Sequence, residues 1–165
     1  PRRPRITIAG VPLHLIQRGN NCQACFFSRA DYHSHLKWLQ ENAQRYSCAI
    51  HAYALMTNHP KKVEREKTGK IDYSRSRTLW EGRFRSCPAW EEEYGLGCYR
   101  YIEPNPVRAK MVEHSAEYQW SSYRANAQGE HSVLLTQHPL YTALGKDDEV
   151  RLTAYRELFR YQLDP

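Results

Sequence analysis

Hydrophobic and polar positions alternate over residues 11–18, as they do along a β-strand whose two faces differ. Leu13 and Leu15 fall on one face of this segment, and His14 and Ile16 fall on the other. The alternation therefore predicts that residues 11–18 form the first strand of a sheet.

A helix and a second strand are predicted after it. Apolar residues recur at helical spacing over residues 29–46, and Ser28 followed by Asp31 is typical of a capped helix start. Residues 48–57 are nearly all apolar or aromatic, as in a central strand that is buried on both faces. A strand, a crossover helix and a second strand predict a sheet covered by helices on at least one side. The recurring apolar residues of the helix are Tyr32, Leu36, Leu39, Ala43 and Tyr46.

The C-terminal part of the chain is predicted to hold a loop and one more helix. Residues 126–138 have the composition of a loop, and Asp147 is placed to cap a final helix. We divide the chain into a core over residues 1–125 and a C-terminal segment over residues 126–165, whose helix would dock on the core or on a partner. Its apolar face would comprise Leu152, Tyr155, Phe159 and Leu163.

Length and charge narrow the class of protein. The chain has 165 residues, which suits one compact domain, and its 41% hydrophobic content is enough for a core. The net charge is +6 and the pI is about 9.1. An excess of Lys and Arg favours a polyanionic partner such as nucleic acid. The alternative is an ordinary basic protein, and composition alone does not separate the two.

Cysteine usage and hydropathy bear on the compartment. Five cysteines, an odd number without the spacing of a disulfide framework, indicate reduced thiols and a cytoplasmic protein. The sequence contains no apolar run of membrane-spanning length and no recognisable signal peptide. We therefore expect no membrane partner.

The segment with the clearest chemistry is the one around Tyr101. Tyr101 and Asn105 stand four residues apart, so on one helix they would share a face, and Asn105-Pro106 would end that helix. A phenol beside an amide that can bind a metal suits nucleophilic attack on a phosphate. The alternative is a core tyrosine followed by an Asn-Pro that only ends the helix. Gly95 and Gly97 each cost about 1 kcal/mol inside a helix and Pro104 costs about 3 kcal/mol, and together these three residues could shift Asn105 off the face of Tyr101.

Four segments in a fixed order give these residues a wider context. The four segments are PLHLIQRGNN (12–21), AYALMTNH (52–59), TLWEGRFRS (78–86) and YIEPNPV (101–107). Together they resemble the REP-associated tyrosine transposases, which are bacterial relatives of single-tyrosine insertion-sequence transposases of the HUH type. The resemblance extends from about residue 1 to about residue 144.

The resemblance implies both a fold and an activity. The fold would be α+β, with helices on an antiparallel sheet in a HUH or ferredoxin-like core. The activity would be metal-dependent cleavage and rejoining of single-stranded DNA, with Tyr101 as the nucleophile and a 5′-phosphotyrosine intermediate. His59 and Asn105 would hold Mg²⁺ or Mn²⁺ as a Lewis acid. The substrates would be DNA hairpins from repetitive extragenic palindromes.

This sequence departs from the family pattern directly after His59. The family has a second histidine two residues later, whereas here Pro60 and Lys61 follow. Residues 60–77 are also too few for the strand and the helix that the family has at this point, so we expect a core that has lost both. The alternative hypotheses are a DNA-binding remnant without catalysis and a partly unfolded relic.

Basic residues in several segments are predicted to contact DNA. Residues 60–77 hold seven Lys and Arg against three Asp and Glu, as in a DNA-binding linker or a solvated loop left by a deletion. Trp80 and Phe84 lie among arginines, a mixture that suits unpaired bases and phosphates or, alternatively, a packed core with surface arginines. The predicted DNA contacts are Arg2, Arg3, Arg5, Arg18, Lys61, Lys62, Arg83, Arg85 and Arg108.

Overall fold

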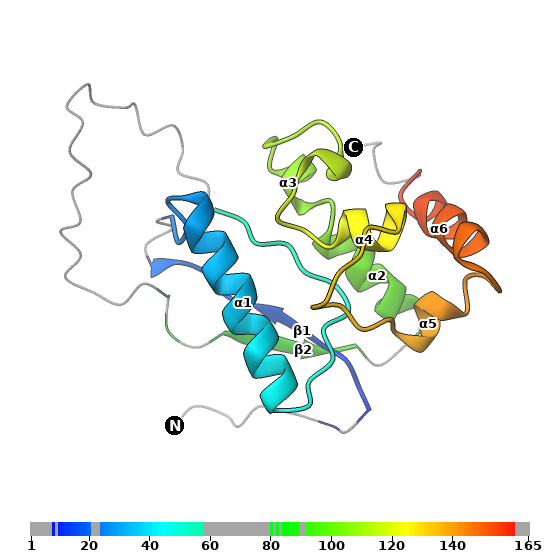
Figure 1. Cartoon of the computed structure of the whole chain (residues 1–165), viewed down its shortest axis with the longest axis horizontal. Coiled ribbons are helices and arrows are strands. Elements are labelled where there is room, and N and C mark those ends of the chain that lie inside the picture. The colour runs from blue at the N-terminus through cyan, green and yellow to red at the C-terminus, as the bar shows by residue number, and fades with distance from the viewer. Residues whose placement is uncertain are drawn as a thin grey trace.

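The computed structural model describes Ile8, residues 10–20, 24–57, Trp80, Gly82, and residues 84–89 and 92–160. Within these residues the fold is α+β, with six α-helices and a two-stranded sheet (Figure 1). None of these helices has the length and apolar character needed to cross a membrane. The elements are β1 (Leu13–Ile16), α1 (Arg29–Arg45), β2 (Arg85–Pro88), α2 (Glu92–Ile102), α3 (Asn105–Arg108), η2 (Ser115–Glu117), α4 (Tyr123–Gln128), α5 (Pro139–Thr142) and α6 (Asp148–Glu157).

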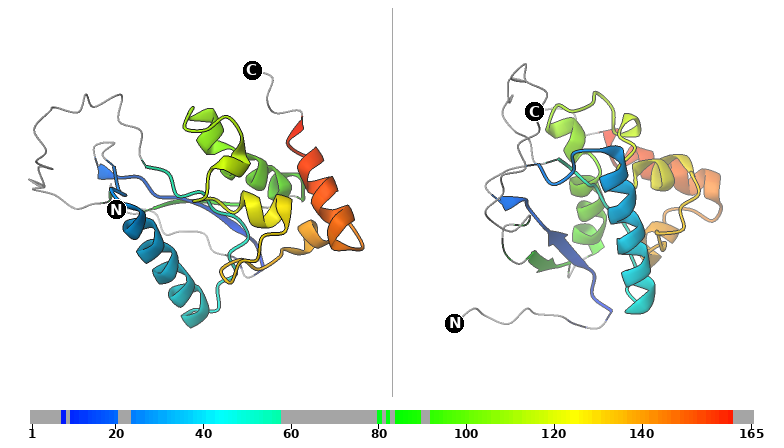
Figure 2. Two further views of the ribbon diagram at one scale, coloured as in Figure 1. Left: turned by 45° about the horizontal axis from the view of Figure 1, so that its top comes forward. Right: turned by 60° about the vertical axis from the view of Figure 1, so that its left-hand side comes forward.

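The two strands pair in the antiparallel direction, which confirms the predicted first strand. His14 of β1 lies opposite Cys87 of β2, and Ile16 lies opposite Arg85. Because directly opposite residues point to the same side of a sheet, these four side chains share one face. Figures 1 and 2 show the sheet and α1 at one end of the molecule and α2, α4, α5 and α6 gathered at the other.

The prediction of a buried central strand over residues 48–57 is wrong. The segment makes only two isolated bridges, a parallel one from Ile50 to Leu135 and an antiparallel one from Ala54 to Ser121. Residues 50–57 are half-buried rather than enclosed on both faces. An apolar run predicts that a segment is buried, but it does not show which strand the segment pairs with. Here the segment pairs only with irregular parts of the C-terminal half.

Helix α1 begins as the sequence predicts. The Ser28 hydroxyl accepts from the Asp31 backbone N–H at 3.3 Å, and the Asp31 carboxylate accepts from the N–H of Ser28 at 2.9 Å, which completes a capping box. A second backbone N–H, from Phe27, donates to the same carboxylate at 2.8 Å. These backbone donors lower the pKa of Asp31.

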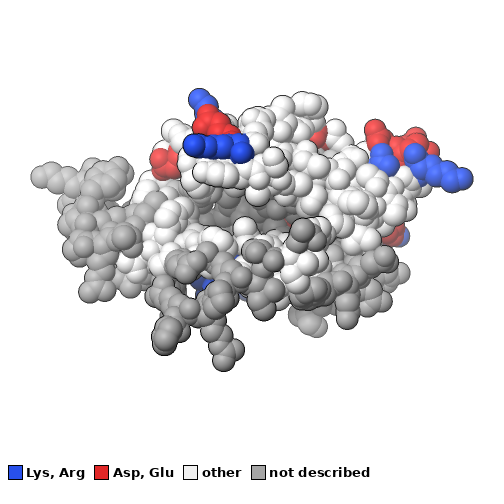
Figure 3. Space-filling model, turned by 90° about the horizontal axis from the view of Figure 1, so that it is seen from below, with Lys and Arg blue, Asp and Glu red and all other residues white. Residues whose placement is uncertain are grey.

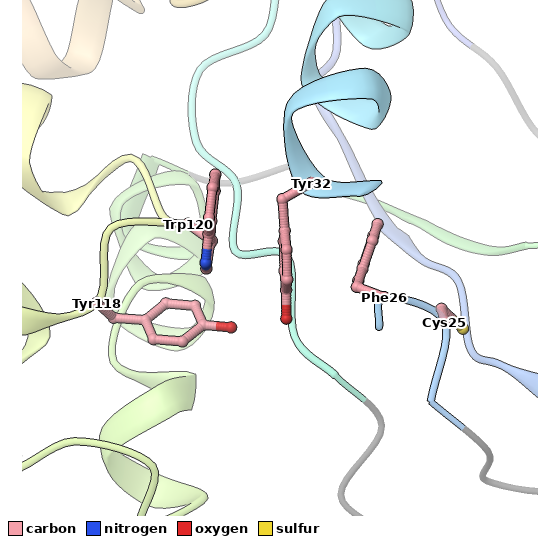
Figure 4. Close-up of a cluster of buried hydrophobic side chains, with 5 residues drawn as sticks. All are labelled: Cys25, Phe26, Tyr32, Tyr118 and Trp120. Carbon is pink, nitrogen blue, oxygen red and sulfur yellow. The ribbon is translucent and has the colours of Figure 1, made fainter. Parts of the chain in front are cut away.

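Stacked aromatic rings hold α1 to the rest of the protein (Figure 4). Tyr32 of α1 lies between Phe26 and Trp120, with 4.4 Å between ring centroids on each side. The three rings are buried, and the Tyr118 hydroxyl donates to the Leu55 carbonyl at 2.7 Å beside them. This first core cluster comprises Cys25, Phe26, Tyr32, Tyr118 and Trp120.

A second core cluster joins the helices of the other end. Its central residue is Tyr155 of α6, which is fully buried and contacts the rings of Tyr99 and Tyr141 edge-on. The C-terminal helix therefore docks on the domain, which was one of its two expected positions. The cluster comprises Tyr99, Tyr123, Ala127, Tyr141 and Tyr155.

The boundaries of the C-terminal elements refine the prediction. Asp147 caps α6 by accepting from the Val150 N–H at 2.9 Å, as expected. The loop predicted from residue 126 begins later, because α4 continues to Gln128 and ends at Gly129, whose φ of +75° suits glycine. Leu163 lies outside the described residues.

One buried carboxylate connects several elements that surround the second core cluster. Glu103, directly after α2, is fully buried. Its Oε1 accepts from the Ser122 hydroxyl at 2.6 Å and from the Asn126 amide at 2.8 Å, and its Oε2 accepts from the Tyr155 hydroxyl at 2.8 Å. Ser122 also accepts from the Tyr53 N–H at 2.9 Å. The carboxylate thus links α2, α4, α6 and the segment that precedes residue 58.

Burial raises the pKa of Glu103 from an ordinary 4.5 to about 7, although its three hydrogen bonds favour the ionised form. As the pH rises from about 4.5 to about 7, Glu103 ionises in the unfolded chain before it ionises in the folded protein. Glu103 therefore adds its full contribution to the free energy of unfolding below pH 4.5. Between pH 4.5 and about 7 this contribution falls by on the order of 3 kcal/mol.

We predict that Glu103→Gln removes this part of the pH dependence. The glutamine keeps an acceptor for Ser122 and Asn126 and does not titrate. Urea unfolding between pH 4.5 and pH 8 measures the effect, with the exposed Glu130→Gln as the matched control. A Glu103→Gln profile parallel to the profiles of wild type and control would contradict the assignment.

Candidate functional site

Tyr101 lies in the last turn of α2 with its ring at the surface. Its side chain is 49% exposed, whereas Tyr99, two residues earlier, is buried in the second core cluster. The His14 ring approaches the Tyr101 ring edge-on, with 5.4 Å between centroids. The alternative of a core tyrosine at position 101 is therefore wrong, and Tyr99 occupies that role.

Arg108 of α3 fixes the end of α2 beneath this tyrosine. Its guanidinium donates to the carbonyls of Tyr101 at 3.0 Å and of Arg100 at 3.2 Å. These are last-turn carbonyls that lack helical partners, and a cation at a helix C-terminus is favourable. The guanidinium carbon also lies 5.4 Å from the centroid of the Tyr101 ring. Arg108, predicted as a DNA contact, thus places an exposed positive charge beside the phenol.

The expectation that Tyr101 and Asn105 share one helical face is wrong. Helix α2 ends at Ile102, and Asn105 begins α3, which makes Asn105-Pro106 a helix start rather than a helix stop. Pro104 lies between the two helices, because it has no N–H and cannot continue α2. Pro106 fits the first turn of α3, where its missing N–H needs no partner.

His14 is a site residue that the sequence analysis did not identify. Its register opposite Cys87 and its contact with the Tyr101 ring show that this face of the sheet lies against α2. Burial lowers the pKa of His14, which favours the neutral imidazole. The alternation over residues 11–18 predicted that His14 lies on the other face of the strand from Leu13 and Leu15. It could not predict the contact with Tyr101, which depends on tertiary packing.

Some of the other residues predicted to contact DNA lie in the described part of the chain, and the rest do not. Arg85 is exposed and shares the sheet face of His14, and Arg18 is exposed shortly after β1. Trp80 packs against the first core cluster, while Phe84 is 37% exposed. Seven predicted site residues lie outside the described residues: Arg2, Arg3, Arg5, His59, Lys61, Lys62 and Arg83.

The ligand set implied for Mg²⁺ or Mn²⁺ is not assembled within the described part of the chain. Those residues contain no group of three His, Cys, Asp or Glu side chains that could hold a metal ion. Asn105 is the one described member of the implied set, and Lys61 stands in the sequence where the family has its second histidine. The described residues therefore do not form a complete cation site.

The positive charge is distributed unevenly along the chain. The described residues carry 13 Lys and Arg against 12 Asp and Glu, so most of the net charge of +6 belongs to the remaining residues. On the face drawn in Figure 3, blue side chains stand beside red ones at separate places. Among the described residues, Arg108 supplies a positive charge next to the Tyr101 ring.

The chain matches no protein-family model, no curated protein and no solved structure.

We predict that Arg108→Ala lowers the free energy of unfolding by about 1 kcal/mol, because two α2 carbonyls lose a charged donor at an exposed site. Arg108→Lys should lower the free energy of unfolding by less, since the positive charge remains. The exposed Lys146→Ala removes the same charge elsewhere and should change stability by less than about 0.5 kcal/mol. Thermal unfolding of the three variants measures this order, and equal effects of Arg108→Ala and Lys146→Ala would refute the capping role.

Proposed function

We propose that the surface around Tyr101 binds single-stranded or hairpin DNA and that Tyr101 attacks a phosphodiester in it. This is the activity of the REP-associated tyrosine transposases that the motifs resemble. The observation that carries the proposal is the half-exposed phenol of Tyr101, held beside the Arg108 guanidinium at the end of α2. A nucleophile at the surface with a cation next to it suits a phosphate substrate.

The chemistry is a transfer between two oxygen nucleophiles. The Tyr101 oxygen forms a bond to phosphorus while the bond from phosphorus to the 3′ oxygen breaks. The phenol loses its proton, and the departing 3′ oxygen gains one. The products are a 5′-phosphotyrosyl enzyme and a free 3′-OH, and the reverse attack rejoins the strand without an external energy source.

Three features support a DNA partner over a small-molecule substrate. The chain is basic overall, Arg85 is on the sheet face that α2 contacts, and the neighbouring Phe84 ring is 37% exposed. Arginines that neutralise phosphates and aromatic rings that stack on bases are the usual components of a single-strand site. A HUH or ferredoxin-like core belongs to the same proposal. The antiparallel pair β1–β2 would be one part of that core.

A divalent cation would belong to the same activity. His59 and Asn105 are the residues that would hold Mg²⁺ or Mn²⁺, which would supply Lewis-acid chemistry at the phosphate. With Lys61 in place of a second histidine, this set is short of a ligand. Cleavage is therefore to be measured with each cation and with a chelator.

We predict a covalent protein–DNA adduct that depends on Tyr101. The protein and its Tyr101→Phe variant are incubated with 5′- or 3′-labelled hairpin DNA, with Mn²⁺, with Mg²⁺ or with EDTA, and separated on a denaturing gel. The label 3′ of the cleavage point should migrate with the wild-type protein and not with the variant. Tyr99→Phe is the matched control and should retain the adduct, provided that it folds. Absence of the adduct under every condition would refute cleavage by Tyr101.

A second candidate function is DNA binding without cleavage. The observation that favours it is Lys61 after His59, because an ammonium group replaces a metal ligand. In that case the wild type forms no adduct, yet hairpin DNA should bind more tightly than random single strands in a gel-shift assay. Affinity should fall steeply with salt concentration, and Arg85→Ala should weaken binding while Tyr101→Phe leaves it nearly unchanged. Equal binding of hairpin and random DNA, with a shallow salt dependence, would exclude this function.

A further inference from the structure

Two cysteines lie at the contact between α2 and the sheet. Cys87 of β2 stands directly opposite His14 in the strand register, and the His14 ring contacts the Tyr101 ring. Cys98 precedes Tyr101 by three residues on α2 and therefore shares its face of the helix. The strand register and the helix spacing thus place both cysteines near the contact between His14 and Tyr101, one on the sheet and one on α2.

The environments of the two thiols differ. Cys87 is exposed, and its Sγ lies 3.7 Å from the carbonyl oxygen of Pro88. Cys98 is half-buried, and burial raises the pKa of its thiol. The sulfur of Cys87 raises the pKa of Cys98 further, as a nearby second thiol does. Cys87 is the more accessible of the two to an oxidant in solution.

We infer that Cys87 and Cys98 are an oxidation-sensitive thiol pair that closes into a disulfide between β2 and α2. With a peroxide as oxidant, the Cys87 thiolate attacks one oxygen, becomes a sulfenic acid and releases water. The Cys98 sulfur then attacks the sulfenic sulfur, and the hydroxyl leaves with a proton as a second water. The two thiols together lose two electrons and two protons, and the peroxide is reduced to two waters.

This disulfide would act on the orientation of α2. It would tie the helix to the sheet one turn before Tyr101, whose ring lies against His14 of the neighbouring strand. The other described cysteines are elsewhere: Cys25 is buried in the first core cluster, and Cys48 follows the end of α1. Oxidation of these thiols does not depend on whether Tyr101 cleaves DNA.

The sequence allows a direct test by mass spectrometry. Trypsin cleaves after Arg85 and Arg100, so both cysteines fall in one tryptic peptide, and a protease specific for glutamate then cleaves between them within residues 91–93. The full chain is treated with hydrogen peroxide, blocked with iodoacetamide and digested. We expect an unblocked tryptic peptide that has lost two hydrogens and whose halves remain joined after the second digestion until dithiothreitol is added. The number of blocked cysteines should fall from five to three.

Variants separate this pair from other oxidation products. Cys87→Ser and Cys98→Ser should each abolish the joined peptide, and Cys48→Ser, the exposed control, should retain it. The yield should not change with protein concentration, because the bond is intramolecular. A peptide that carries two blocked cysteines, or disulfides that join Cys87 or Cys98 to a different cysteine, would overturn the inference.

Discussion

The carboxylate of Glu103 is the interaction on which the arrangement of the helices depends. A fully buried carboxylate is costly unless its oxygens are hydrogen-bonded, and here a hydroxyl, an amide and a phenol supply the donors. The donors come from Ser122, Asn126 and Tyr155, so one side chain sets the positions of α2, α4 and α6 relative to each other. Breaking the network would leave several buried polar groups without partners, which disfavours alternative packings of the same helices.

The position of Tyr101 follows from this anchor. Tyr99 packs in the second core cluster, Glu103 is held in the network, and Tyr101 lies between them on the opposite side of the helix end. The Arg108 guanidinium then donates hydrogen bonds to the last carbonyls of α2. A phenol that is half-exposed at the surface is thus attached to a helix end whose flanking side chains are buried and hydrogen-bonded.

Sequence patterns predicted the elements whose signals are local. The capping box at Ser28, the cap at Asp147 and the alternation in β1 each depend on a few neighbouring residues, and each is confirmed. Residues 48–57 were mispredicted because an apolar run states burial without naming a pairing partner. Glu103 and His14 were not identified as important, since their partners are distant in sequence: Tyr155 is 52 residues from Glu103, and Tyr101 is brought to His14 only by tertiary packing.

The candidate site separates into parts with different structural origins. The residues that position Tyr101 are Glu103, Arg108 and His14, and none of them belongs to the ligand set implied for the cation. The contacts that place the phenol therefore do not depend on that set. Under the proposed function, a chain without a complete ligand set would keep the tyrosine and its neighbouring arginine in place, and a loss of cleavage would not by itself imply a loss of DNA binding.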